Sequence, residues 1–249
     1  MNSREVAEIP TGPVPVPEAV TRVAQGDDIT PVWRNSLGGL TFRLDAPGGD
    51  TRFVKWVAHG TAELDLAAEA RRLDWASNWV RVPHVLHHGA CDDGEWLVTT
   101  PVPGRSAVDP RWLRDPATAA TAVGTGLRLL HEALPVADCA YEWSVESRLR
   151  DAEGDIRARL ADSPPTDREV VCHGDACAPN TLLHDDGTVS GHVDLGSLGV
   201  ADRWADLAVA AWSVDWNHGP GYARLVFRGY DIEPDPDRLA YYRLLWDLT

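Results

Sequence analysis

The chain has 249 residues, of which 44% are hydrophobic and 24% are charged, a composition that excludes disordered and collagen-like proteins. The formal net charge of −15 argues against a nucleic-acid partner and is compatible with a cationic small-molecule partner. No apolar run approaches the roughly 20 residues that span a bilayer, and the first ten residues carry charge where a signal peptide is apolar. We therefore expect a cytoplasmic protein without a membrane partner, either a monomer or a weak dimer.

The N-terminal half predicts a flexible lead-in followed by a small lobe. Prolines recur in residues 11–17, so we expect residues 1–28 to be loose. Short strand-like runs then predict a nucleotide-binding lobe over residues 29–100. Its expected elements are an antiparallel meander, one helix and two further strands, at residues 31–36, 40–46, 51–58, 62–78, 84–93 and 94–102.

Residues 101–104, Pro-Val-Pro-Gly, predict a hinge, because two prolines stiffen the chain where strand periodicity gives way to helix periodicity. Residues 105–249 predict a mainly helical lobe that carries the catalytic and acceptor-binding residues. The expected elements are helices over 117–133 and 144–160, a hairpin over 182–193 and a closing helical stretch over 205–248. The fold class is therefore α+β with two lobes. Four scattered cysteines without metal or framework spacing predict reduced thiols.

Three residues in the second half have the spacing of a phosphoryl-transfer site. Asp175 lies five residues before Asn180, and Asp194 follows after a hairpin in an Asp-Leu-Gly segment. In kinase chemistry a base carboxylate orients the attacking hydroxyl, while an Asn and a second Asp hold Mg²⁺ through oxygen atoms. Each residue alone is more often a turn or cap residue. The three in this order favour catalysis.

Lys55 is the only lysine among 23 basic residues, which indicates that its position requires an ammonium group. It lies in the third expected strand, where a kinase-like lobe holds the lysine that contacts nucleotide phosphates. Glu69 on the following helix is its expected partner, with Glu63 and Asp65 as alternatives. The turn at Ser36, which precedes Gly38-Gly39, can cover phosphates with backbone N–H groups.

The stretch over residues 170–208, VVCHGDACAPNTLLHDDGTVSGHVDLGSLGVADRWADLA, resembles the bacterial aminoglycoside O-phosphotransferases, and the 3'-phosphotransferase branch most closely. The resemblance implies a protein-kinase-like bilobal fold, ATP and Mg²⁺ as cofactors, and transfer of the γ-phosphate to a hydroxyl of an antibiotic, most readily the 3'-hydroxyl. Carried over by position, it implies Asp175 as the catalytic residue, Lys55 and Glu69 at the phosphates, and Phe53 stacked on adenine. It also implies that the Mg²⁺ ligands are Asn180 and Asp194.

The hinge register predicts how a purine would be held. Pro101 and Pro103 have no N–H to donate, so Val102 is the expected donor to adenine, beside carbonyl groups that include that of Thr100. This pattern favours ATP over GTP.

The expected acceptor-binding residues depart from the family pattern. Asp215 and Asp247 remain, together with the terminal Thr249, whereas Trp216 and Trp246 add aromatic faces where relatives are richer in acids. Three alternatives therefore stay open for the acceptor: a basic peptide antibiotic, a macrolide or a metabolic alcohol. A nucleotide-binding pseudoenzyme is a further alternative, against which the complete set of Lys, Asp, Asn and Asp argues.

Overall fold

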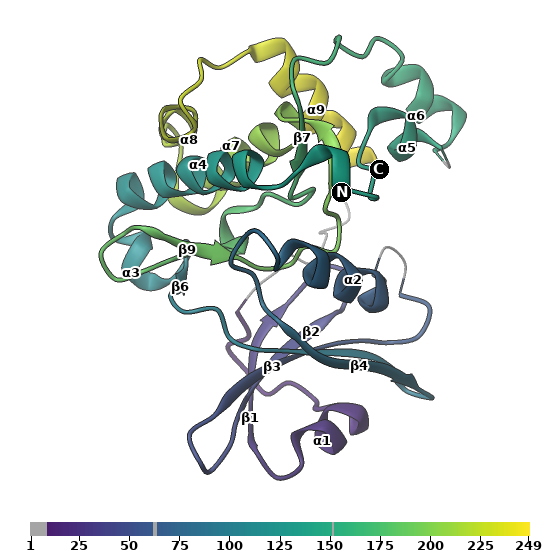
Figure 1. The fold of residues 1–249 in the computed structure, drawn as a ribbon, viewed down its shortest axis with the longest axis vertical. Coiled ribbons are helices and arrows are strands. Elements are labelled where there is room, and N and C mark those ends of the chain that lie inside the picture. The colour runs from purple at the N-terminus through teal and green to yellow at the C-terminus, as the bar shows by residue number, and fades with distance from the viewer. Residues whose placement is uncertain (1–8, 62–63, 151) are drawn as a thin grey trace. The chain divides into compact units, whose positions relative to one another are not determined.

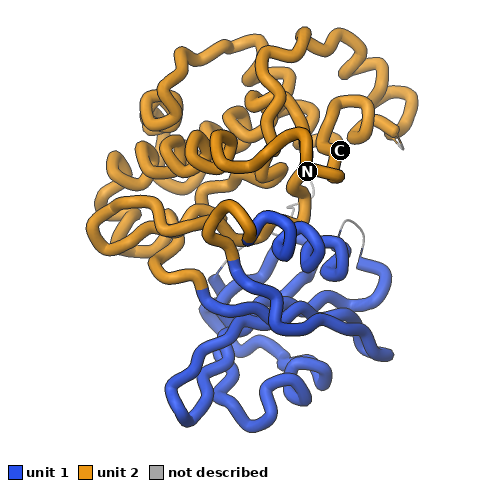
Figure 2. Tube along the Cα trace, viewed as in Figure 1, with its two compact units in different colours: residues 1–77, 83–101 blue, residues 78–82, 102–249 orange. Residues whose placement is uncertain are grey.

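The computed structural model describes residues 9–61, 64–150 and 152–249, which form two compact units (Figure 2). Within these ranges, the first unit contains residues up to 77 together with 83–101, and the second contains 78–82 and 102–249. The chain therefore leaves the first unit between Pro101 and Val102. The short segment 78–82, which the sequence assigns to the first lobe, belongs to the second unit.

The first unit is built on a five-stranded antiparallel sheet with the order β1-β2-β3-β5-β4. Its strands lie close to the predicted ranges, and the first three form the predicted meander. Gly-rich turns separate these three strands, as the sequence suggests. The strands are β1 (Asp28–Arg34), β2 (Leu40–Asp45), β3 (Thr51–Val57), β4 (Val85–Cys91) and β5 (Gly94–Thr99).

A helix covers each face of this sheet (Figure 1). Side chains alternate between the two faces along a strand. Val54 of β3 is buried in one cluster with Val20 and Val23 of α1 (Glu18–Ala24). Its neighbour Lys55 points the other way, to Glu69 of α2 (Leu66–Ala76).

The expectation of a loose lead-in through residue 28 is wrong for α1. Both faces of the sheet carry large apolar side chains, and α1 buries one of these faces with Ala19, Val20, Val23 and Ala24. Residues 1–8 of the expected lead-in lie outside the described residues. The prolines directly before α1 favour extended chain, so the sequence pattern did not predict a helix at this point.

The expected helix over residues 62–78 is shorter in the structure. It begins at Leu66, because Asp65 Oδ1 accepts a hydrogen bond from the Ala68 N–H at 2.7 Å and caps the first turn. It ends at Ala76. Ala62 and Glu63 of the expected helix lie outside the described residues.

The second unit is mainly helical and carries two small sheets. β6 (Arg105–Ser106), β8 (Thr181–Leu183) and β9 (Val189–His192) form one sheet, and β7 (Glu169–Cys172) pairs with β10 (Gly199–Asp202) in the other. The β8–β9 pair is the predicted hairpin. The helices are α3 (Pro110–Leu113), α4 (Pro116–Ala133), η1 (Val136–Asp138), α5 (Val145–Leu149), α6 (Gly154–Arg159), η2 (Ala178–Asn180), α7 (Trp204–His218), α8 (Ala223–Tyr230) and α9 (Pro236–Leu248).

Two expected helical stretches are interrupted. The single helix expected over 144–160 is two short helices, α5 and α6, and Gly154, a weak helix former, lies at the start of the second. The closing stretch divides into α7, α8 and α9, since Gly219-Pro220-Gly221 ends the first of these and Pro234 precedes the last. The four cysteines, all in the described part of the chain, form no disulfide, as predicted.

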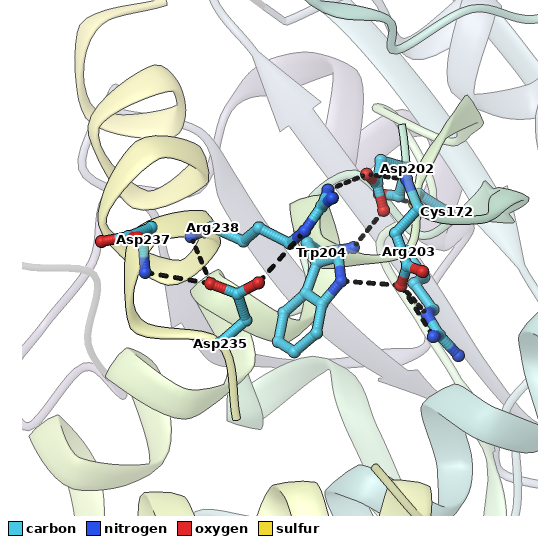
Figure 3. Close-up of polar contacts among 8 residues, drawn as sticks. Cys172, Asp202, Arg203, Trp204, Asp235, Asp237 and Arg238 are labelled. Carbon is cyan, nitrogen blue, oxygen red and sulfur yellow. Dashed lines mark hydrogen bonds and ion pairs between the residues drawn. The ribbon is translucent and has the colours of Figure 1, made fainter. Parts of the chain in front are cut away.

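A cluster of charged side chains centred on the buried Asp202 links the start of α9 to β10 (Figure 3). The side chain of Asp202, only 2% exposed, accepts hydrogen bonds from Arg238 Nη1 at 3.0 Å and from the backbone N–H of Asp167 at 2.9 Å. Asp167 in turn accepts from Arg203 Nε at 2.7 Å and from the Trp204 indole at 2.9 Å. The last helix is therefore held by charge-assisted bonds as well as by apolar packing.

We expect Asp202→Ala to lower the free energy of unfolding by about 1.5–3 kcal/mol, the contribution of a hydrogen bond to a charged group. Arg238 would lose its buried carboxylate partner and keep only the more exposed Asp235, 3.2 Å away, and the Asp167 N–H would lose its acceptor. Urea denaturation measures this change. Asp185→Ala is the matched control, since Asp185 is 74% exposed where it pairs with Arg105, and such pairs contribute about 0–1 kcal/mol. Equal losses in the two variants would contradict the role given to Asp202.

Candidate active site

Lys55 and Glu69 form a close ion pair in the first unit. Lys55 Nζ lies 2.6 Å from Glu69 Oε1, and the glutamate side chain is only 6% exposed. Asp65, the alternative partner, instead caps α2, and the other alternative, Glu63, lies outside the described residues. Phe53 lies two residues before the lysine on β3, opposite Thr99 of β5. The alternation of a strand places Phe53 on the face that carries Lys55.

The turn between β1 and β2 does not offer all the backbone donors that the sequence suggests. Asn35 Oδ1 accepts from the N–H groups of Leu37 at 3.0 Å and Gly39 at 2.7 Å, and the Asn35 carbonyl accepts from Gly38. These three donors are therefore used within the turn. Ser36 is exposed at its tip, and contact between Ser36 and a phosphate stays a prediction.

The hinge keeps the donor pattern that the sequence predicts. The Thr100 N–H donates to the carbonyl of His84 at 2.9 Å, and the Thr100 hydroxyl accepts from the His84 N–H at 3.0 Å. Thr100 thus has no N–H to offer, and Pro101 and Pro103 never have one. Val102 is left as the donor in this segment, and its bond to a nucleotide stays a prediction.

Asp175 and Asn180 lie together in the loop after β7. The turn of η2 folds the chain back, so that Asn180 Nδ2 donates to the Asp175 carbonyl at 3.0 Å and to Asp175 Oδ2 at 3.2 Å. The Asp175 N–H donates to His173 Nδ1 at 3.3 Å, and His173 Nε2 donates to the Val193 carbonyl at 3.0 Å. Asp175 Oδ1 is buried and has no hydrogen-bond partner among the described residues. Asp175 Oδ1 can therefore accept a hydrogen bond from a bound molecule.

The pKa of Asp175 is raised, first by burial and second by the nearby Asp194 carboxylate. Contacts with Cys177, His173 and Asn180 act in the opposite direction without cancelling these effects. Two carboxylates that repel each other in a buried setting form a site in which a cation would be stabilised.

The backbone places Asp194 in a strained conformation. Its φ of 66° lies in the left-handed region, which costs a non-glycine residue about 1–3 kcal/mol. The other non-glycine residues with positive φ in the described ranges, Gln25 and Asp231, follow helices as C-caps, where this conformation is common. Asp194 follows a strand instead. Gly174 packs against the same segment, since a Cβ there would lie 2.0 Å from the Ser197 carbonyl oxygen.

The residues present fit a magnesium ion. Asn180 uses its amide nitrogen toward Asp175, so its carbonyl oxygen lies on the other side of the amide. Carboxylate and amide oxygens are the ligands that this hard cation takes. Asn180 and Asp194 would supply them.

Asp206 holds the loop that precedes Asp175 by its backbone, and it is absent from the site residues predicted from the sequence. This buried residue of α7 accepts from the N–H groups of His173 at 2.6 Å and Gly174 at 2.9 Å. His131 Nε2 lies 2.9 Å from the same carboxylate, and His131 Nδ1 lies 2.8 Å from the Tyr230 hydroxyl. Burial raises the pKa of Tyr230 to about 12, so the hydroxyl stays protonated. Helices α4, α7 and α8 thus meet at one buried polar chain.

Burial acts to raise the pKa of Asp206, but the hydrogen bonds that it accepts outweigh burial, and the pKa is lowered. Asp206 is therefore ionised, and its hydrogen bonds with the two loop N–H groups are charge-assisted. An aspartate among apolar residues at the start of α7, residues 204–209, is the sequence signal that could have found it. Cys172 lies close to His131 and Asp206, but burial raises the pKa of its thiol well above the usual value, which disfavours a metal-binding thiolate there.

Of the four expected acceptor residues, Asp215 and Trp216 lie on α7, Asp247 lies on α9, and Thr249 follows α9 directly. The two helices pack together. Asp215 Oδ1 accepts from the Ala223 N–H at 2.7 Å, and Asp247 pairs with Arg243 at 2.8 Å. Thr249 Oγ1 accepts from Arg148 Nε at 3.0 Å. Trp216 is exposed. Their contact with an acceptor stays a prediction.

Comparison with known proteins identifies the family of this chain. Residues 28–242 match the model of the phosphotransferase enzyme family named APH. The chain belongs to this family. It is 37% identical to a streptomycin 3''-kinase of Streptomyces griseus over 94% of this chain and 98% of that protein. It is 35% identical to an aminoglycoside 3'-phosphotransferase of Streptomyces fradiae over 73% of this chain and 79% of that protein.

The fold is also that of this family. A solved aminoglycoside phosphotransferase of Streptomyces rimosus, in complex with ADP and streptomycin, superposes with a TM-score of 0.69 at 29% identity, covering 92% of this chain and 96% of that one. The predicted kinase-like α+β fold is thereby confirmed, and the chain is a phosphotransferase. Among the described residues, no helix is both long enough and apolar enough to cross a membrane.

We expect Asp175→Asn to lower kcat by about 10²–10⁴, the usual contribution of a positioned acid or base. Nucleotide affinity should stay unchanged, because in kinase chemistry this carboxylate orients the acceptor hydroxyl and does not bind the nucleotide. Steady-state kinetics and calorimetric titration with ADP measure the two quantities. A kcat within tenfold of the unaltered enzyme would remove Asp175 from this role.

Proposed function

We propose that this chain transfers the γ-phosphate of ATP to a hydroxyl group of an aminoglycoside antibiotic and so inactivates the drug, which confers resistance. The observation that carries this proposal is the buried, unpartnered Oδ1 of Asp175 beside Asn180 and Asp194, in a chain of a phosphotransferase family. A scaffold without activity would not require this arrangement.

The residues divide the chemistry between them. Asp175 Oδ1 accepts the hydrogen bond of the acceptor hydroxyl and orients its oxygen toward the phosphorus atom. Lys55, fixed by Glu69, binds phosphate oxygens, and Phe53, Thr100, Val102 and Ser36 contribute to nucleotide binding. Asn180 and Asp194 would hold Mg²⁺, which would supply positive charge to stabilise the transferred phosphate.

The acceptor class is supported by the relatives. The two curated relatives described above are named for phosphorylation of an aminoglycoside or of streptomycin, and the Streptomyces rimosus structure contains ADP and streptomycin. The two names differ in the hydroxyl, 3' in one and 3'' in the other. The motifs in residues 170–208 favour the 3'-hydroxyl.

An ADP-release assay with ATP, Mg²⁺ and a panel of hydroxylated compounds tests the proposal. The panel holds streptomycin, kanamycin, a macrolide, a basic peptide antibiotic and a simple alcohol. We expect ADP release with the aminoglycosides and with none of the other compounds. Phosphorus NMR of the product identifies the hydroxyl that is phosphorylated. Release with another acceptor, but with no aminoglycoside, would contradict the acceptor class. No release with any compound would favour the pseudoenzyme.

The hinge predicts the nucleotide. Adenine presents an acceptor at N1 beside a donor amino group, which a single Val102 N–H next to a carbonyl can satisfy, whereas guanine presents the reverse pattern. We therefore expect a higher kcat/KM with ATP than with GTP. Steady-state kinetics with both nucleotides measure it. A preference for GTP would show that the hinge register is wrong.

A further inference from the structure

A cavity of about 230 Å³ lies in the second unit, where the last turns of α4 and α8 meet the segments that precede β7 and α7. Three guanidinium groups, two carboxylates and one tyrosine line this cavity, here called the arginine pocket. None of the candidate active-site residues lines it, so it is a separate feature of this unit. The lining residues are Arg128 and Glu132 of α4, Arg168 before β7, Arg203 before α7, and Tyr230 and Asp231 at the end of α8.

The guanidinium of Arg128 has one edge without a protein partner. Its Nη1 lies 3.5 Å from Glu132 Oε1, whereas its Nε is buried and has no hydrogen-bond partner among the described residues. A buried donor without a partner is rare in native proteins. The Nε–H and Nη2–H groups of an arginine form one fork, which can donate to two oxygens of a single oxyanion. A molecule bound in the pocket can therefore supply the acceptor that the chain does not.

Arg203 and Arg168 bring two further guanidinium groups to the pocket. Arg203 directs Nε and Nη2 to Asp167, each at 2.7 Å, and its Nη1 has no partner in the described ranges. Within the same ranges, the side chain of Arg168 forms no hydrogen bond or ion pair. Burial raises the pKa of the Tyr230 hydroxyl to about 12, although both arginine charges act to lower it. The hydroxyl is therefore neutral and does not offset these charges.

The carboxylates of the lining lie farther toward solvent than the arginine donors. The side chain of Glu132 is 49% exposed and Asp231 is exposed, whereas the side chain of Arg203 is 20% exposed and Arg128 Nε is buried. Water and salt screen exposed charges more strongly than buried ones. The inner part of the pocket therefore favours an anion. Because Asp167 already offsets the charge of Arg203, the pocket suits a ligand of low charge.

We propose that the arginine pocket binds one phosphate group, as inorganic phosphate or as a phosphate monoester. This tetrahedral group presents several acceptor oxygens at once, which suits the fork of Arg128 and the remaining donors of Arg203 and Arg168. A nucleoside triphosphate carries too many negative charges for a lining that includes Glu132 and Asp231. The pocket is thus a binding site apart from the site of phosphate transfer, and its occupancy does not require the proposed function.

Calorimetric titration of the full chain with potassium phosphate tests this site. The chain is first saturated with Mg²⁺ and a non-hydrolysable ATP analogue, so that phosphate cannot bind in place of the nucleotide phosphates, and KCl keeps the ionic strength constant. We expect one phosphate to bind per chain.

Arg168→Gln should raise the Kd for phosphate at least about tenfold, as for the loss of a hydrogen bond to a charged group. Arg168 is exposed, so this variant should keep its fold. Arg224→Gln is the matched control, because Arg224 of α8 is also exposed, has no side-chain partner in the described ranges and lies outside the pocket lining. It should leave the Kd unchanged within about twofold.

A second variant and a second ligand complete the test. Arg128→Lys keeps the charge but removes the Nε–Nη2 fork, so it should also raise the Kd. Titration with glycerol 1-phosphate distinguishes the two sources of the phosphate group: tighter binding than that of inorganic phosphate assigns the pocket to monoesters, and equal or weaker binding assigns it to inorganic phosphate.

The absence of saturable binding of both compounds to the unaltered chain would overturn the inference. Binding that neither Arg168→Gln nor Arg128→Lys weakens, or that Arg224→Gln weakens equally, would also overturn it. None of these results bears on ADP release with an aminoglycoside, so the proposed function is tested separately.

Discussion

The conformation of the loop that carries Asp175 depends on a single buried carboxylate. Asp206 accepts two consecutive backbone N–H groups, those of His173 and Gly174, immediately before Asp175. Hydrogen bonds to a charged group contribute about 1.5–3 kcal/mol each, and an unpaired buried charge costs more. His131 and Tyr230 complete the chain of contacts from two other helices. The loop conformation is therefore tied to the helical packing of the second unit.

With residues 173 and 174 fixed by Asp206, further contacts of this loop position Asp194 and Asn180. Gly174 permits the close approach to the Ser197 carbonyl, which brings the loop against the segment of Asp194. His173 bridges to the Val193 carbonyl, and η2 returns Asn180 to Asp175. A cation bound at this point would relieve the repulsion between the Asp175 and Asp194 carboxylates. In the first unit, the Lys55–Glu69 pair is held by the same device, a buried carboxylate on a helix.

The parts of the structure with short-range signals could be predicted from the sequence. The strands of the first sheet, the β8–β9 hairpin and the spacing of Asp175, Asn180 and Asp194 depend on alternation, turn residues and local order. Helix α1 could not be predicted, because seven residues after a proline run carry little periodicity and their burial depends on a sheet formed later in the chain. Asp206 was missed for a related reason: its partners are backbone groups more than 30 residues away. Such contacts leave no spacing pattern between side chains, so the sequence signal for Asp206 is the apolar character of its neighbours in α7.

The measurement that tests this account most directly is the kinetics of Asp206→Asn. An amide presents one acceptor oxygen where the carboxylate presents two, so one loop N–H loses its partner while helix α7 keeps its size and shape. The account predicts a fall in kcat of at least about tenfold, equivalent to 1.4 kcal/mol, with the KM for ATP, the affinity for ADP and the far-ultraviolet dichroism unchanged. A kcat within twofold of the unaltered enzyme would contradict it, because the loop would then hold Asp175 without Asp206.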